Sequence, residues 1–337
     1  MPSVTVIAPI RNGIEFVDDF VRQMRGELGV DDRVIVVDDA STDGSAEAVE
    51  RATHGDSRFL LIRNEKNLGV AKSRNLAVGM VRTEFVWFVD HDDFWESGTL
   101  SHYRAAIEDA DVLISRADYR TRPDVPGRIV DGIDRAEDLD AAGALRLMLE
   151  GLVHGYLWSK LIRTSVLGVD PFPPLTSQSD FCGVAAMVSR ASKVKTIPDV
   201  RYHYIKRTGS ITRGRRVELG NFMVGRETML NAAGRVGLDR DTNLLQFFTC
   251  WFFCHALVFV PLRQGSPREI FDEGMRLSRR TLRGIPLLPV FRRRPRVGAE
   301  MLLLRYGWFA YRPVMSMALR VVDARKREAE RRSTGGK

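Results

Sequence analysis

Apolar runs alternate with amphipathic segments through the first hundred residues. Four short apolar runs predict buried strands, at 4–10, 34–37, 58–62 and 85–89. The segments between them carry apolar residues at helical spacing and predict helices, at 14–24, 46–52 and 70–80. Strands that alternate with helices predict an α/β fold, in which a mostly parallel sheet has helices on both faces.

The run FVWFVDHDDFW, residues 85–95, is predicted to form the centre of this sheet. Its five apolar residues end directly in the carboxylates Asp90, Asp92 and Asp93. Ligands of open α/β sheets bind beyond the carboxyl ends of the strands, and Asp90 and Asp92 point the same way there. Carboxylate oxygens at this spacing suit a hard divalent cation such as Mg²⁺ or Mn²⁺. The alternative is that the acids only form a turn and a helix N-cap.

Three predicted strand ends meet at one edge of the sheet. They are the turn from Pro9 to Gly13, the acids Asp38 and Asp39, and the acids that begin at Asp90. Asp38 or Asp39 can accept hydrogen bonds from a ribose or a uracil N–H. A dinucleotide-binding domain would place a glycine-rich turn after its first strand. The turn here, APIRNG, has a single glycine, which favours a metal-bridged nucleotide over NAD.

The remaining sequence predicts a second half of the sheet domain and then helices. We expect a strand at 110–115, a polar loop at 116–138, a helix at 139–152 and a closing strand and loop at 200–212. Helices without strands are predicted after residue 212, at 217–233, 243–260, 267–283 and 299–323 with a break at Pro313. The most apolar stretch, 244–262, is interrupted by Gln246, Thr249 and His255, which favours a core helix over a membrane span.

The charge is divided unevenly along the chain, whose formal net charge is +8. Residues 212–337 hold 25 Lys and Arg against 11 Asp and Glu, so the front of the chain is acidic and the back basic. Residues 285–296 and 301–311 combine apolar and aromatic side chains with arginines. This composition suits the inner face of an anionic membrane or a polyanionic acceptor, and a solvated basic face is the alternative. The absence of nucleic-acid-binding motifs argues against nucleic acid.

The remaining composition bounds the class of protein. At 337 residues and 44% hydrophobic, the chain is long enough for one large domain with an extension or for two domains. Its first residues enter a strand without a secretion signal, so we expect a cytoplasmic protein, with peripheral contact to the inner membrane face as a further expectation. Three cysteines form no disulfide framework and are expected in the core.

Four successive motifs resemble the family 2 glycosyltransferases, which have the GT-A fold. They are VTVIAPIRNG, VIVVDDASTDGS, RNEKNLGVAKSRNLAV and EFVWFVDHDDFW, in the family's order between residues 4 and 95. The resemblance implies a Rossmann-like GT-A domain followed by a helical C-terminal region. It also implies that the nucleotide is surrounded by Pro9, Asn12, Asp39 and Arg74, and that Asp90 and Asp92 form the DxD motif. Many members have Tyr where this chain has Arg11.

Later segments resemble the acceptor side of the same family. GYLWSKL would supply an acceptor wall, which consists of Tyr156, Trp158 and Lys160, although core packing of the aromatic residues is the alternative. Asp180 corresponds to the general base, although Ser179 stands where relatives carry Glu. Asp180 has an alternative role as a helix cap. Within VRYHYIKRTGSIT, Arg207 and Ser210 would contact the diphosphate of the donor.

The resemblance implies an inverting enzyme that uses Mn²⁺ or Mg²⁺ and a nucleotide-sugar donor, expected to be a UDP-sugar. Its acceptor would be an anionic cell-surface polymer such as wall teichoic acid, or a lipid-linked precursor. We expect a catalytic domain at 1–212 with a nucleotide-sugar half (1–96) and an acceptor half (97–212), a helical region at 213–323 and a disordered basic tail at 324–337. The alternative function is an inactive GT-A scaffold in a polysaccharide-assembly complex. The oligomeric state is left open.

Overall fold

The structure is a computed structural model that describes residues 2–206 and 217–334, with the side chains of the last helix described as far as residue 321. It forms two compact units. One contains the described residues up to 206 together with 227–240, and the other contains 217–226 and the residues from 241 onward. Helix α7 (Leu219–Arg235) therefore contributes to both units, whereas the expected boundary at residue 212 would place it in one.

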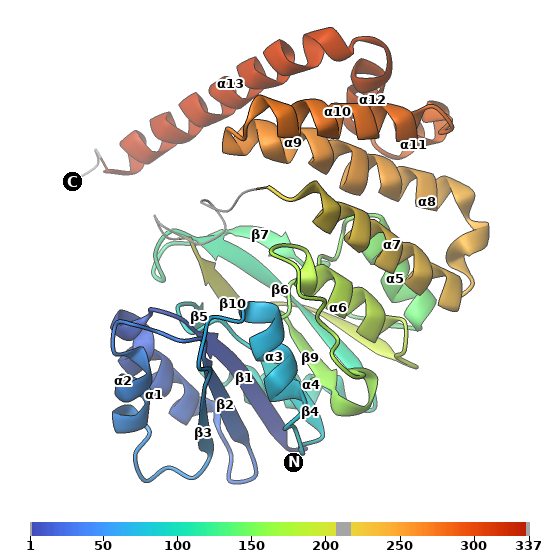
Figure 1. The fold of residues 1–337 in the computed structure, drawn as a ribbon. Coiled ribbons are helices and arrows are strands. Elements are labelled where there is room, and N and C mark those ends of the chain that lie inside the picture. The colour runs from blue at the N-terminus through green and yellow to red at the C-terminus, as the bar shows by residue number, and fades with distance from the viewer. Residues whose placement is uncertain (1, 207–216, 335–337) are drawn as a thin grey trace. The chain divides into compact units, whose positions relative to one another are not determined.

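The first unit is built on a ten-stranded sheet (Figure 1). Its strands are β1 Val4–Ile10, β2 Arg33–Asp38, β3 Phe59–Arg63, β4 Phe85–Phe88, β5 Phe94–Trp95, β6 Val112–Arg120, β7 Arg128–Asp131, β8 Glu137–Leu139, β9 Lys160–Arg163 and β10 Val194–Ile205. The order is β3-β2-β1-β4-β9-β6-β10-β5, while β7 pairs with β6 and β8 with β10. The first four strands are parallel, and β9 is antiparallel to both its neighbours. The expected α/β fold is confirmed.

Helices cover both faces of this sheet. They are α1 Val17–Glu27, α2 Ser45–Ala52, α3 Val70–Val78, α4 Thr99–Ile107, α5 Ala141–Leu149 and α6 Ser179–Val188. On one face, α1 and α4 bury Phe20 and Tyr103 against alternate residues of β1, β2 and β4. On the other face, α3 packs on β1 and β2, as Figure 1 shows. Because β1 and β4 are buried on both faces, their sequences are continuous apolar runs, and this is why the pattern predicted them well.

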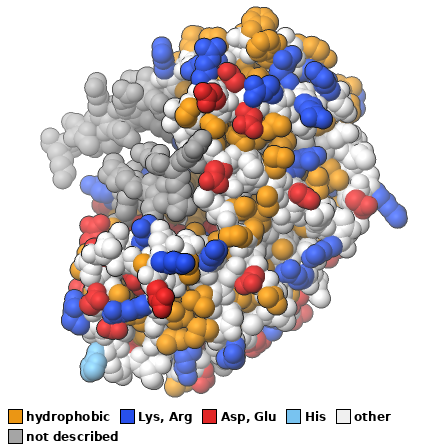
Figure 2. Space-filling view, viewed as in Figure 1, with side chains coloured by type: hydrophobic (Ala, Val, Ile, Leu, Met, Phe, Trp, Pro, Cys, Tyr) orange, Lys and Arg blue, Asp and Glu red, His pale blue; other side chains and the backbone are white. Residues whose placement is uncertain are grey.

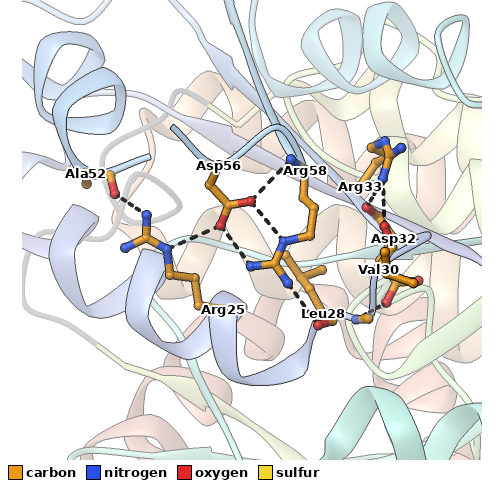
Figure 3. A network of polar contacts seen from close by, with 9 residues as sticks. Arg25, Leu28, Val30, Asp32, Arg33, Ala52, Asp56 and Arg58 are labelled. Atoms are coloured by element: carbon orange, nitrogen blue, oxygen red, sulfur yellow. Dashed lines mark hydrogen bonds and ion pairs between the residues drawn. The ribbon is translucent and has the colours of Figure 1, made fainter. Parts of the chain in front are cut away.

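The end of the sheet away from the strand carboxyl termini is held by ion pairs (Figure 3). Asp56, which precedes β3, accepts hydrogen bonds from Arg58 Nε at 2.9 Å and Nη2 at 2.8 Å. Arg25 of α1 lies 3.4 Å from the same carboxylate and donates to the carbonyl of Ala52 at the end of α2. One carboxylate thus ties α1, α2 and β3 together.

Two expected features are wrong. The segment 116–138, expected as a loop, contains the end of β6 together with β7 and β8. The break expected at Pro313 lies at Gly307, because α12 (Pro295–Tyr306) ends there and Pro313 is only the sixth residue of α13 (Trp308–Thr334). Disorder of the basic tail stays a prediction.

The second unit consists of helices. After α7 it contains α8 Thr242–Phe248, the π-helical turn Thr249–Cys254, α9 His255–Gln264, α10 Arg268–Leu282, α11 Leu287–Arg293, α12 and α13. Helices α9 and α10 lie so close that a Cβ on Gly274 would be 1.9 Å from the carbonyl oxygen of Leu257. In the described part of the chain, one helical stretch, Thr242–Gln264, is long and apolar enough to cross a membrane, and 67% of its apolar window is buried.

Candidate active site

The ends of β1, β2 and β4 bring the predicted nucleotide residues to one edge of the sheet. These strands run parallel, with Ile10 beside Asp38 and Ile7 beside Phe88 in the register, so the segments that follow them leave in the same direction. Asn12 connects two of these segments. Its Oδ1 accepts a hydrogen bond from the Thr42 amide at 2.8 Å, and its own amide donates to Ser41 Oγ at 2.9 Å.

The single glycine of the first turn lies against His91. A Cβ on Gly13 would be 2.1 Å from Nε2 of His91, so a larger residue there would require the His91 ring to move. His91 also lies 3.2 Å through Nδ1 from the carbonyl of Pro9. The turn after β1 is thus packed against the acidic segment after β4, which places Pro9 beside the predicted metal-binding residues.

The two acids after β2 hold neighbouring backbone. Asp39 is buried and accepts hydrogen bonds from the amides of Leu68 at 2.7 Å and Gly69 at 2.8 Å, and from Asn64 Nδ2. It therefore fixes the loop that leads into α3. Asp38 accepts a hydrogen bond from the Ser41 amide through Oδ2, and its buried Oδ1 has no hydrogen-bond partner among the described residues. Contact of either acid with a ribose or uracil stays a prediction.

Arg74 joins the predicted DxD motif to the predicted base. It lies on α3 with only 5% of its side chain exposed. Its Nη1 donates to Asp180 Oδ1 at 2.6 Å, and its Nη2 donates to Asp90 Oδ1 at 3.1 Å. Asp180 is the second residue of α6 and keeps 38% of its side chain exposed, so the paired carboxylate still faces solvent. Three residues from distant parts of the sequence therefore form one charged cluster.

Buried negative charge accumulates around Asp90. Burial raises the pKa of Asp90 to about 6, and although Arg74 opposes the shift, Asp92 and Asp180 add to it. The pKa of Asp93 is raised well above its ordinary value by burial and by the charges of Asp90 and Asp92. The Tyr202 hydroxyl accepts from the Asp90 amide at 3.0 Å and donates to Asp93 at 2.9 Å, which fixes the backbone of the motif.

A divalent cation fits this arrangement of charges. Among the residues that the structure describes, no three His, Cys, Asp or Glu side chains are grouped to hold a metal alone. A cation bound through one or two carboxylates and the phosphates of a substrate needs no such group. Asp90 and Asp92 would supply hard oxygen ligands. Added positive charge would favour the ionised form of Asp90, whose pKa is raised by burial and, to a smaller extent, by Asp92 and Asp180.

The predicted acceptor wall is partly core. Trp158 is 5% exposed, and it stacks on Tyr202 at 5.0 Å between ring centroids, while Tyr156 stacks on its other side at 4.7 Å. Lys160 is fully buried and lies 2.7 Å from the buried Asp131. Of the three, Tyr156 alone is partly exposed, and its contact with an acceptor stays a prediction.

A second close approach connects this wall to the base. A Cβ on Gly155 would lie 2.3 Å from Cα of Phe181, the residue after Asp180. The turn that carries Tyr156 therefore abuts the first turn of α6. Ser179, which replaces the expected Glu, is buried, and its hydroxyl has no hydrogen-bond partner among the described residues. Arg207 and Ser210 lie outside the described residues, so their contact with a diphosphate stays a prediction.

Part of the sheet unit matches a known protein family. Residues 5–155 match the family model described as Glycosyl transferase family 2. Residues 5–155 are therefore similar to the family 2 glycosyltransferases. The match includes the predicted DxD motif and Arg74 and ends at Gly155, just before the predicted acceptor wall. This finding agrees with the expected family and the expected class of enzyme.

Curated proteins similar to the chain are named for different activities. The chain is 27% identical over 169 residues to the putative glycosyltransferase EpsH of Bacillus subtilis, covering 49% of this chain and 48% of EpsH. It is 26% identical to the cholesterol galactosyltransferase of Borreliella burgdorferi, covering 74% and 73%. It is also 26% identical to the poly(ribitol-phosphate) beta-N-acetylglucosaminyltransferase TarS of Staphylococcus aureus, covering 62% of this chain and 36% of TarS. The chain thus spans about half the length of EpsH and less of TarS.

The fold of the chain resembles that of a solved structure. Residues 1–349 of S. aureus TarS, solved in complex with UDP-GlcNAc, align with a TM-score of 0.67 at 20% identity and cover 92% of each chain. This likeness confirms the GT-A fold and the helical C-terminal region.

Three buried residues hold neighbouring parts of the candidate site in place, and the sequence assigned none of them a role. Asp131 and Asp93 are buried acids, and Tyr202 is a buried hydroxyl donor and acceptor. Asp93 was visible as the third acid after β4, but nothing in the pattern distinguished it from Asp90. Asp131 lies in the segment expected as a loop, and its pairing with Lys160 spans 29 residues, so no local signal indicates it.

Proposed function

We propose that the chain is an inverting, metal-dependent glycosyltransferase that moves a sugar from a UDP-sugar to a hydroxyl of a cell-surface polymer or a lipid-linked precursor. The observation that carries this proposal is the placement of Arg74, which hydrogen-bonds to Asp90 at 3.1 Å and to Asp180 at 2.6 Å. It supports a cluster in which a proposed metal-binding motif lies near a solvent-accessible carboxylate. The proposed reaction uses both, one at the diphosphate and one at the attacking hydroxyl.

In the reaction, Asp180 is the general base. Its free carboxylate oxygen takes the proton from the acceptor hydroxyl as the hydroxyl oxygen bonds to the anomeric carbon. The bond from that carbon to the diphosphate oxygen breaks at the same time, and the electron pair leaves with the nucleoside diphosphate. Because attack comes from the face opposite the diphosphate, the anomeric configuration inverts. Arg74 orients Asp180 through the other oxygen.

Asp90 and Asp92 would hold Mn²⁺ or Mg²⁺ at the diphosphate. The cation supplies positive charge that stabilises the departing nucleoside diphosphate. Arg207 and Ser210 are proposed to contact the same phosphates. Pro9, Asn12, Asp38 and Asp39 are proposed to line the nucleoside site, since they form or brace the turns beside it.

The relatives support the proposed substrates. The TarS fragment was solved with UDP-GlcNAc, which supports a UDP-sugar donor. TarS is named for transfer to poly(ribitol-phosphate), and another relative is named for transfer to cholesterol, which support a polymer or a lipid acceptor. The expected acceptor residue Tyr156 would lie against either, with Trp158 and Lys160 holding it in place. We propose that the reaction takes place in the cytoplasm.

The test is a screen of nucleotide sugars for release of nucleoside diphosphate, with Mn²⁺, with Mg²⁺ and with a chelator. We expect one UDP-sugar to be turned over only with metal, and Asp92→Ala to abolish turnover. Asp19→Asn, at an exposed acid on α1, is the matched control and should keep full activity. Failure of every donor, with bacterial membranes and teichoic acid added as acceptors, would contradict the proposal and favour the inactive scaffold.

A further inference from the structure

Helix α13 carries a row of exposed apolar side chains. Phe309, Pro313, Met317 and Val321 follow one another at intervals of four residues, so they lie along one face of the helix, and we call them the α13 row. Phe309 is 74% exposed and Met317 is 70% exposed. Soluble proteins seldom expose a continuous apolar strip of this kind unless it meets a partner.

The row is exposed although α13 is docked on its own unit. Tyr311, on a different face of the helix, is fully buried. Its hydroxyl donates to Glu300 Oε1 at 2.7 Å, and its ring lies 6.4 Å from the ring of Phe271. The helix therefore has one face that packs against α10 and α12 and another that remains exposed.

The helices from α10 to α13 are rich in arginine, and Arg312 and Arg320 lie on α13 itself. Residues 268–321 contain 12 Arg and only 4 Asp and Glu. The guanidinium of Arg279 lies 4.7 Å from the ring centroid of Trp308, and that of Arg305 lies 5.8 Å from the ring centroid of Tyr306, which is 68% exposed. Figure 2 shows hydrophobic and basic side chains beside one another at the end of the view where Figure 1 places α10, α12 and α13.

We propose that the α13 row and its arginines bind the surface of an anionic phospholipid bilayer. An interfacial helix inserts an apolar face at the level of the headgroups while basic residues pair with lipid phosphates. Arginine side chains beside aromatic rings suit the boundary between headgroups and acyl chains. The methylene groups of the arginine stay against the ring while the guanidinium reaches the headgroups.

Other occupants fit less well. A soluble polyanion would pair with the arginines but leave Phe309 and Met317 in water. Pairing with a second copy of the same surface would place the arginines of one chain against those of the other, and the repulsion between like charges is unfavourable. The proposal goes beyond the proposed function and stands without it, because binding to vesicles needs neither donor nor acceptor.

The test is flotation of the full chain with vesicles of phosphatidylglycerol and phosphatidylcholine, and with vesicles of phosphatidylcholine alone. We expect binding to the anionic vesicles only, weakened by high salt. The double variant Phe309→Ser and Met317→Ser should lose binding, and Arg320→Glu should weaken it. Val169→Ser, at a position that is 93% exposed on the sheet unit, is the matched control and should bind like the wild type.

Three outcomes would overturn the proposal. The first is equal binding to both kinds of vesicle. The second is retention of binding by the double variant, which would place the membrane contact elsewhere. The third is retention on immobilised polyphosphate, by wild type and double variant alike, without any vesicle binding. Circular dichroism of each variant establishes that it is folded, so that a loss of binding reports on the surface.

Discussion

Arg74 is the residue on which the proposed site depends most. Its guanidinium group hydrogen-bonds to both Asp90 and Asp180, and it uses a different nitrogen for each. A guanidinium can make both contacts because its N–H groups spread in a fixed plane, whereas an ammonium is a single point charge. Replacing the side chain therefore tests whether the geometry of the pair matters or only its charge.

We expect Arg74→Lys to lower kcat/KM by about 10²-fold, since a displacement of about 1 Å at the reacting groups has an effect of this size. Steady-state kinetics of transfer measures the loss. Arg82→Lys is the matched control, because Arg82 is exposed just after α3 and donates only to nearby carbonyls. Equal activity of Arg74→Lys and wild type would show that the paired geometry is not needed.

Asp90 should lower the stability of the folded protein at neutral pH. Its pKa is raised to about 6 from 3.8, so the folded state binds a proton more tightly than the unfolded state does. Its destabilising effect is then absent below about pH 4, grows as the pH rises to about 6 and is complete above that. We expect Asp90→Asn to raise the free energy of unfolding at pH 7 by about 1–3 kcal/mol.

Urea denaturation at several pH values, with a chelator present, measures this effect. The gain of Asp90→Asn over the wild type should shrink as the pH is lowered from 7 toward 4. Lower stability of the variant at pH 7 would contradict the account, because it would mean that the ionised carboxylate stabilises the folded state.

Lys160 and Asp131 form a fully buried ion pair, so removal of one partner should destabilise strongly. Lys160→Met leaves the carboxylate of Asp131 without its counterion, and we expect a loss of about 3–5 kcal/mol. The double variant with Asp131→Asn should be less destabilised than the single one. Thermal or urea denaturation measures both. Equal losses would indicate that the charge on Asp131 is not what makes the single variant unstable.

At the scale of elements, the ion pairs of Figure 3 hold α1, α2 and β3 together far from the proposed chemistry. Arg58 holds the pKa of Asp56 below its ordinary value, so the carboxylate stabilises the fold above about pH 4 and this contribution is lost as the pH falls further. We expect Asp56→Asn to lower stability by about 1 kcal/mol at pH 7 while transfer is unchanged. Loss of transfer in a folded variant would contradict this separation.

The sequence predicts the elements with strong local signals and misses those formed by distant pairing. Strands such as β1 and β4 are continuous apolar runs, and the acids at the ends of β2 and β4 pointed to the candidate site. The segment containing β7 and β8 is polar and rich in turns, and its strands form only because β6 and β10 are beside it. Likewise, Arg74 and Asp180 are 106 residues apart, so each was found by its motif, while their contact needed the fold.

At the scale of the whole molecule, the chain joins a sheet unit that carries the proposed chemistry to a helical unit in which basic residues outnumber acidic ones. Residues 212–337 hold 25 Lys and Arg against 11 Asp and Glu, and the remaining residues have an acidic excess. Because of this division, we expect substitutions in the two units to affect different measurements. Substitutions in the cluster around Arg74 should affect transfer in solution, whereas substitutions in the α13 row should affect binding to vesicles.

The most direct test of the central claim is a comparison of donor binding and sugar transfer in Asp180→Asn. Calorimetric titration with UDP-GlcNAc, or with the donor found in the screen, measures binding in the presence of Mn²⁺. We expect binding close to that of the wild type and transfer reduced by about 10²–10⁴-fold, the usual contribution of a general base. Transfer at the wild-type rate by this variant would contradict the assignment of Asp180 and the mechanism built on it.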